Sequence, residues 1–99
     1  MEVRIIKAPS EGVKEILKRR IDHSLAEAVE SADAVGLMQG RLIDMVFAID
    51  IAEKTSGVNV ADVRGNCPQN VVMTAVFGET SSVEAAMSNV RAWISEGFK

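Results

Sequence analysis

The sequence predicts an α/β fold in which about four antiparallel strands are covered by helices, in the order β-α-(α)-β-α-β-β-α. Short β-branched apolar segments alternate with segments whose apolar residues recur at helical spacing, and turn-forming residues separate them. The chain has 99 residues, of which 47% are hydrophobic and 25% charged, as in globular proteins. This length suits one domain over residues 1–99. Such a domain packs its helices on the sheet in two layers.

The N-terminal half is predicted to hold two strands with one or two helices between them. Val3–Ala8 is a short apolar strand ended by Pro9, and Ser10 can cap the next helix. The apolar face of that helix is predicted to consist of Val13, Ile16, Leu17 and Ile21. Ser24–Glu27 has the capping-box pattern of a second short helix. Ala34–Met38 is an apolar run typical of a buried strand.

The C-terminal half is predicted to form a helix, a hairpin and a last helix. Gln39-Gly40 is predicted to turn the chain, and Gly57 to end the next helix. The apolar residues of this helix at helical spacing are Leu42, Met45, Val46, Ile49 and Ala52. Val58–Arg64 and Val71–Phe77 read as the hairpin strands. Ser81–Glu84 is a further capping box, and Val83, Met87, Val90 and Ile94 follow at helical spacing.

Composition excludes several classes of protein. A single Cys cannot form an intrachain disulfide, which fits the reducing cytoplasm. The longest apolar run, Met45–Ile49, is too short to cross a bilayer, and no signal peptide is visible. A net charge of −3 argues against general nucleic-acid binding. We therefore expect a cytoplasmic protein whose partners are neither nucleic acid nor membrane.

The basic run Lys18–Arg20 has two readings. It is the only run of its kind in the sequence, and it falls at the end of a predicted helix. Because cations are common in the last turn of a helix, we interpret it as a solvated helix end rather than a phosphate or membrane patch.

The sequence contains few residue patterns that are typical of an enzyme active site. Asp22-His23-Ser24 has the residue types of a hydrolytic triad, but adjacent side chains point in different directions and cannot form the relay. We expect an exposed His23 beside a capping Ser24. Glu27, Glu30 and Asp33 can share a helix face, which we interpret as solvated rather than as a cation site.

Cys67 lies in the turn-rich segment 65–70 rather than on an apolar face. Gly65 allows a tight bend before it, and Pro68 restricts the backbone after it. A thiol followed by Pro also occurs among iron–sulfur ligands, but one thiolate cannot hold a cluster. An exposed, unligated Cys is therefore the simpler reading, unless a rotational axis gathers one thiol from each subunit.

Several segments together resemble the bacterial microcompartment shell domain. In that family a short strand and a Gly-rich turn lead into a helix with an Asp and, four residues later, a Lys, as in Ala34–Met38 and Ala48–Lys54. Val71–Ala86 is similar to the last core strand and second helix of the family. Val3–Ser10 resembles the strand that usually closes the domain, and its position at the start is that of the circularly permuted branch.

The resemblance implies flat cyclic hexamers that tile into the shell of a protein organelle. The loop between the two middle strands lines a central pore, and metabolites pass through it. The corresponding residues here are Gly65, Asn66, Cys67, Pro68, Gln69 and Asn70. Lys54 corresponds to the lysine at the edge between hexamers. The loop looks like that of the U-type shell protein of glycyl-radical propanediol microcompartments, whose pore is associated with an iron–sulfur cluster, and Cys67 matches its cysteine.

The expected partners are further copies in a homohexamer, other shell proteins and enclosed enzymes. A cluster, for example of four irons, would be shared between Cys67 residues of several subunits. Two alternatives stay open. One is a small α/β regulatory module that binds a metabolite between subunits. The other is a thiol enzyme with Cys67 as nucleophile, for which His23 is the only histidine base in the chain.

Overall fold

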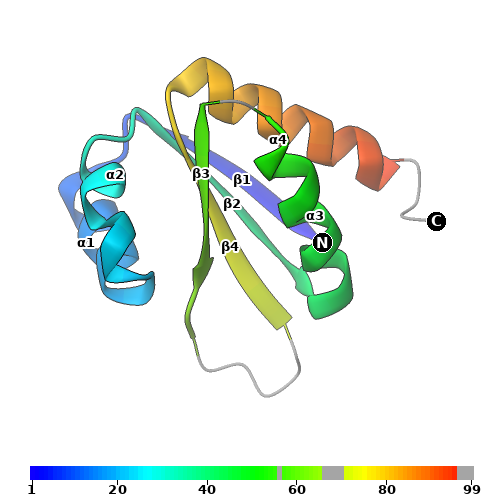
Figure 1. The fold of residues 1–99 in the computed structure, drawn as a ribbon, viewed down its shortest axis with the longest axis horizontal. Helices are drawn as coiled ribbons and strands as arrows, with labels where there is room; N and C mark the ends of the chain where they lie inside the picture. Colours follow the sequence, from blue (N-terminus) through cyan, green and yellow to red (C-terminus); the bar gives the residue numbers. More distant parts are fainter. Residues whose placement is uncertain (56, 66–70, 96–99) are drawn as a thin grey trace.

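The computed structural model describes residues 1–55, 57–65 and 71–95. Within them, four strands form an antiparallel sheet in the order β1-β2-β4-β3. The strands are β1 (Glu2–Lys7), β2 (Ala34–Arg41), β3 (Val58–Val63) and β4 (Val71–Gly78). The helices are α1 (Glu11–Arg20), the 3₁₀ helix η1 (His23–Leu25), α2 (Ala26–Glu30), α3 (Leu42–Glu53) and α4 (Thr80–Ser95). The predicted fold class and element order are confirmed (Figure 1).

Helices cover both faces of the sheet, so the molecule has three layers and not the two that were predicted. Figure 1 shows α1 and α2 on one side of the strands and α3 and α4 on the other. The central strands explain this, because Ala34 and Met38 of β2 pack toward α3 and α4 while Val35 packs toward α1 and α2. A strand that is apolar on both faces needs cover on both, which one layer of helices cannot supply.

The predicted turn at Gln39-Gly40 is wrong. Gln39 pairs with Met73 and Gly40 with Val72, so β2 continues to Arg41. The helix α3 then begins directly at Leu42. Pairing with β4 along the whole length of β2 outweighs the local tendency of Gln-Gly to turn.

Helix starts were predicted with mixed success. The Ser10 hydroxyl accepts a hydrogen bond from the Val13 N–H at 3.3 Å, which confirms the first cap. The predicted cap at Ser24 is wrong, because the Asp22 carboxylate accepts from the Ser24 N–H at 2.9 Å and caps η1 instead. Hydrogen bonds from the Ser24 side chain and backbone lower the pKa of Asp22. Ser81 lies inside α4, which begins at Thr80.

Helical periodicity was detected correctly, but it did not decide which residues are buried. In α1, Leu17 is buried while Ile16 is half exposed. In α3 the buried residues are Met45, Ala48 and Ala52, whereas the predicted face included Leu42 and Val46, both more than half exposed. In α4, the predicted residues Val83, Met87 and Val90 are buried. The prediction that Gly57 ends α3 is wrong, because α3 ends at Glu53 with Lys54 as its C-cap, and Gly57, with φ +84°, lies in the turn before β3.

Thr74 is the one buried polar side chain in the described part of the chain, and its hydroxyl has no hydrogen-bond partner there. It lies on β4 between Val72 and Val76, on the face that packs against α3 and α4. A buried hydroxyl without a partner costs about 1–3 kcal/mol. Replacing Thr74 by Val keeps the shape and removes that cost, so we expect the free energy of unfolding in urea to rise by about 1 kcal/mol.

The matched control for Thr74→Val is Val76→Thr, which places a hydroxyl two residues away on the same buried face. We expect this variant to lower the free energy of unfolding by about 1–3 kcal/mol. A loss of stability in Thr74→Val would contradict the assignment of Thr74 as an unsatisfied group.

Candidate functional site

The candidate site begins where β3 ends and β4 starts. Arg64 and Gly65 follow β3, and β4 begins at Val71. Cys67, the predicted cluster ligand, lies outside the described residues, as do Asn66, Pro68, Gln69 and Asn70. Gly65 does not have a left-handed φ, and a Cβ there would meet only an Arg20 nitrogen at 3.9 Å. The structure therefore shows no steric reason for a glycine at position 65, where Gly65 was predicted to allow a tight bend before Cys67.

A reciprocal contact between two arginines holds this end of the sheet. The Arg64 N–H donates to the Arg20 carbonyl at 2.7 Å, and the Arg20 guanidinium donates back to the Arg64 carbonyl at 3.1 Å. The Arg64 guanidinium also donates to the carbonyl of the buried Ile21 at 3.0 Å. These bonds tie the C-terminal end of α1 to the chain beside Gly65. Sequence reasoning missed them, because Arg20 and Arg64 are far apart in sequence.

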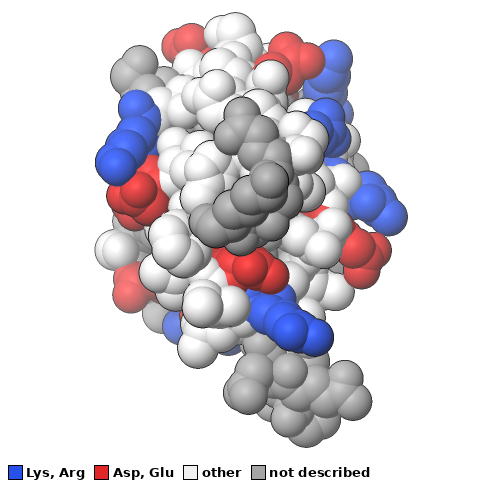
Figure 2. All heavy atoms as spheres, turned by 90° about the vertical axis from the view of Figure 1, so that its right-hand side faces the viewer, with Lys and Arg blue, Asp and Glu red and all other residues white. Residues whose placement is uncertain are grey.

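An apolar surface, here called the α3 stripe, runs along the outer side of α3. It consists of Leu42, Ile43, Val46 and Phe47, each at least half exposed. Phe47 stacks on Trp93 of α4 with ring centroids 5.2 Å apart. Figure 2 shows uncharged side chains over much of this side of the molecule, with acidic and basic side chains along its margins and below its centre. A helix that is apolar all round is usually covered on all sides.

A second apolar surface, here called the α1 groove, lies on the opposite side of the sheet. It is a hollow of about 1080 Å³ between α1 and the strands. Its apolar lining includes Ile6, Val13, Ile16, Leu17, Leu37, Val71 and Met73. Arg20, Asp62, Arg64 and Gly65 also line it, so the groove extends to the end of the sheet where the candidate loop begins.

Comparison with known proteins decides the family. No protein-family model matches the chain, and no curated protein matches it significantly. The ligand-free structure of the GrpU microcompartment shell protein from Clostridiales bacterium 1_7_47FAA is similar with a TM-score of 0.74 and 47% identity, covering 99% of this chain and 96% of that one. The ligand-free GrpU microcompartment shell protein from Pectobacterium wasabiae has a TM-score of 0.71 and 30% identity, covering 91% and 99%. The chain belongs to the GrpU microcompartment shell proteins.

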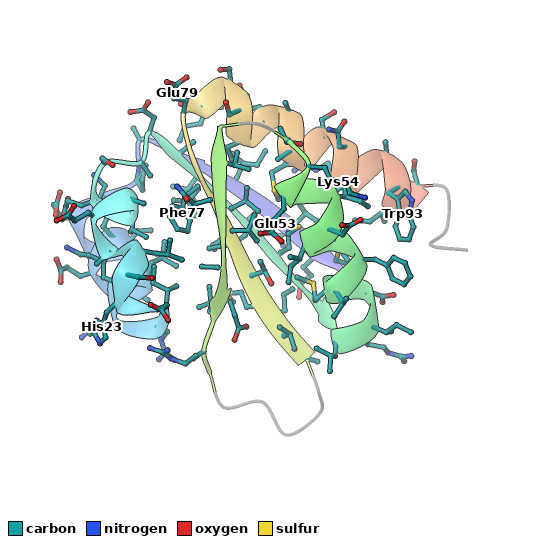
Figure 3. All side chains as sticks on the ribbon, in the orientation of Figure 1. His23, Glu53, Lys54, Phe77, Glu79 and Trp93 are labelled. Carbon is teal, nitrogen blue, oxygen red and sulfur yellow. The ribbon has the colours of Figure 1, made fainter. Side chains whose placement is uncertain are left out.

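Membership of the GrpU shell proteins confirms the resemblance seen in the sequence and gives this chain a structural role in a microcompartment shell. No helix in residues 1–55, 57–65 and 71–95 has the length and hydropathy that a membrane span requires. His23 is exposed, as predicted, on the outer side of the α1–α2 layer (Figure 3).

The predicted edge residue of the GrpU-type chain, Lys54, directly follows α3 (Figure 3). Its ammonium group lies 2.9 Å from the Asp50 carboxylate, one helical turn earlier, so the Asp and Lys of the shell-domain pattern form an ion pair. The Lys54 side chain is 74% exposed. Exposed pairs of this kind contribute little to stability, which leaves Lys54 available at the surface.

Glu30 of α2 is paired with two lysines, whereas it was predicted to be solvated, and Glu27 is exposed as predicted. Glu30 accepts from Lys18 at 2.7 Å and lies 3.7 Å from Lys14. The hydrogen bond from Lys18 lowers the pKa of Glu30 and raises that of Lys18. Glu11, Glu15 and Glu30 gather their oxygens within 4.8 Å. Because Lys14 and Lys18 balance two of the three negative charges and reach from α1 to Glu30, the evident role of this group in the shell protein is to join α1 to α2.

Proposed function

We propose that this chain forms a cyclic homohexamer in a bacterial microcompartment shell, with residues 65–70 of each subunit around a central pore. The observation that carries the proposal is the 47% identity to a GrpU microcompartment shell protein over 99% of the chain. The organelle would lie in the bacterial cytoplasm. Other shell proteins and the enclosed enzymes would be its partners, and Lys54 would contribute to the edge between hexamers.

The two apolar surfaces support a ring of copies. A cyclic contact other than a two-fold one joins two different patches, and the α3 stripe and the α1 groove lie on opposite sides of the sheet. Both lie near the same end of the sheet. The stripe begins one residue after Arg41, which pairs with Val71, and the groove is lined by Gly65 and Val71. Docking the stripe of one copy in the groove of the next would bring this end of each subunit toward the ring axis.

The donor chemistry of the chain supports an iron–sulfur cluster shared between subunits. Soft thiolates suit such clusters, whereas the three-carboxylate group of α1 and α2 suits hard cations. One chain offers a single thiol, Cys67, whereas an iron–sulfur cluster takes about four thiolate ligands. Cysteine ligation of a cluster therefore needs Cys67 from several copies of the chain. Because no such cluster has six-fold symmetry, some Cys67 thiols would stay unligated.

The roles of the loop residues follow from this arrangement. Cys67 would ligate iron, and Gln69 and Asn70 would donate hydrogen bonds to the sulfurs. A bound cluster supplies one-electron redox chemistry. The pore would therefore pass electrons across the shell or deliver clusters to enzymes inside it.

The test is purification without oxygen, followed by size-exclusion chromatography with light scattering and a visible spectrum across the peak. We expect a brown hexamer. Cys67→Ser should remain a hexamer and lose the colour and the bound iron, because it removes the only thiol of each chain.

The possible outcomes test the hexamer, the iron–sulfur cluster and the role of Cys67 as its ligand separately. A colourless wild-type hexamer without iron would contradict the cluster and keep the ring. A brown Cys67→Ser protein would contradict Cys67 as the ligand. A smaller colourless species would contradict the hexamer and favour the regulatory module that binds a metabolite between subunits.

A further inference from the structure

We propose that Arg19, Arg20 and Arg64, at the end of the α1 groove nearest Gly65, form a binding site for small oxyanions, such as a phosphate or a carboxylate metabolite. A hollow of about 610 Å³ is lined by Ile16, Arg19, Arg20, Arg64 and Gly65. Three of these five residues carry guanidinium groups, in a chain whose net charge is −3. The site lies next to the position where the proposed pore loop begins.

The arginines of this hollow differ from most of the other cations in having no acidic partner. Five other cations of the described chain have a carboxylate oxygen within 4.0 Å, namely Arg4, Lys7, Lys14, Lys18 and Lys54. Within residues 1–55, 57–65 and 71–95, no ion pair involves Arg19, Arg20 or Arg64. Like charges gathered around one hollow repel one another, and an anion between them relieves that repulsion.

Two nearby carboxylates do not fill this role. Asp22 is close enough for Arg64 to contribute to the lowering of its pKa, but its carboxylate is taken by hydrogen bonds from Ser24, which are the larger cause. Asp62 lines the adjoining α1 groove and not the hollow. The positive charge of the hollow is therefore left for a ligand from outside the chain.

Helix electrostatics account for only part of the cluster. Cations are favourable in the last turn of a helix, which explains Arg19 and Arg20 at the end of α1. Arg64 follows β3 and comes from another part of the sequence, so the helix dipole does not explain its presence.

The hollow is partly preorganised for an anion. Arg20 donates through one nitrogen to the Arg64 carbonyl, and Arg64 donates through one nitrogen to the Ile21 carbonyl. A guanidinium has five N–H donors, so each anchored side chain keeps others for a ligand. Planar guanidinium groups match carboxylate and phosphate oxygens in pairs, which defines the ligand class.

This placement gives the site a use in the proposed shell. An anion held beside Gly65 would be concentrated at the entrance of the pore loop. That use rests on the proposed function and requires the docked α3 stripe of the next copy to leave this end of the α1 groove open, because Ile16, Arg20, Arg64 and Gly65 line both the groove and the hollow. The binding itself depends only on Arg19, Arg20 and Arg64.

The test is calorimetric titration of the full chain with inorganic phosphate at low ionic strength. Arg19→Gln is the main variant, because Arg19 has no hydrogen bond or ion pair among the described residues and its loss leaves the Arg20–Arg64 contact intact. We expect saturable binding that weakens about five- to tenfold in this variant and less in Arg19→Lys. Arg91→Gln is the control, because Arg91 is an exposed arginine of α4 on the other side of the sheet. It should bind phosphate as the wild type does.

The site would be overturned by a wild-type chain that shows no saturable phosphate binding, or by equal weakening in Arg19→Gln and Arg91→Gln. Loss of the hexamer in Arg19→Gln without any phosphate binding by the wild type would also overturn it, and would indicate that the arginines face a neighbouring copy. Cys67→Ser should bind phosphate normally. That result separates failure of the anion site from failure of the proposed cluster.

Discussion

Replacing Ile43 by Glu is expected to convert the proposed hexamer into folded monomers. Ile43 is 67% exposed on the α3 stripe, so the substitution removes no packing within the chain. It lies in the first turn of α3, where a carboxylate is favoured by the helix dipole. In a ring that covers the stripe with the apolar lining of the α1 groove, the same carboxylate would lose its hydration, which costs several kcal/mol at each contact.

The mass of Ile43→Glu by light scattering and its far-UV circular dichroism test this expectation. Val46→Glu, on the same stripe and 58% exposed, should act in the same way. Ala85→Glu also adds a carboxylate at an exposed helical position, but on α4 and outside the stripe, and should remain a hexamer. A hexamer that persists in both stripe variants would show that the α3 stripe is not a contact between copies.

The largest effect on folding is expected from Gly78→Ala. Gly78 ends β4 with φ +157°, and a Cβ there would lie 2.5 Å from the Gly57 carbonyl oxygen. This is a backbone atom, so no side chain can rotate away to relieve the clash. The Gly78 carbonyl also accepts from the Asp33 N–H at 2.9 Å, which limits movement of the strand end. We expect the free energy of unfolding to fall by about 3 kcal/mol or more, a large share of the usual 5–15 kcal/mol.

Urea unfolding of Gly78→Ala should be compared with Gly12→Ala. A Cβ on Gly12, in α1, would meet only the Ser10 hydroxyl oxygen at 3.9 Å. Alanine is favoured over glycine in helices, so this control should be neutral or more stable by up to about 1 kcal/mol. Similar unfolding midpoints for the two variants would contradict the close approach of Gly78 to Gly57.

Features that depend on near neighbours in sequence were predicted correctly. The Ser10 cap acts on an N–H three residues away, and Val83, Met87 and Val90 are buried on α4 at the predicted helical spacing. The β-branched segment from Val71 became a central strand of the sheet. The strand predicted from Val3 is present as β1, which begins at Glu2 and pairs with β2.

The errors have a common physical cause, because tertiary contacts outweighed local preference. Gln39-Gly40 is held straight by pairing with β4, and Asp22 takes the capping role predicted for Ser24. Leu42 and Val46 were predicted to share a face with Met45, yet only Met45 of these three is buried and the other two are more than half exposed. Apolar residues of α3 are both buried and exposed, so their spacing does not select the face toward the sheet.

By itself, the sequence determined the order of elements, the single thiol at Cys67 and the family to which the chain belongs. These depend on local spacing, on residue identity and on segments that stay contiguous in the chain. Only the tertiary structure decided which side of α3 is left apolar and exposed, and that Arg20 and Arg64 share one hollow. Packing of α1 on the sheet brings these two arginines together, and no pattern within α1 or β3 alone encodes that contact.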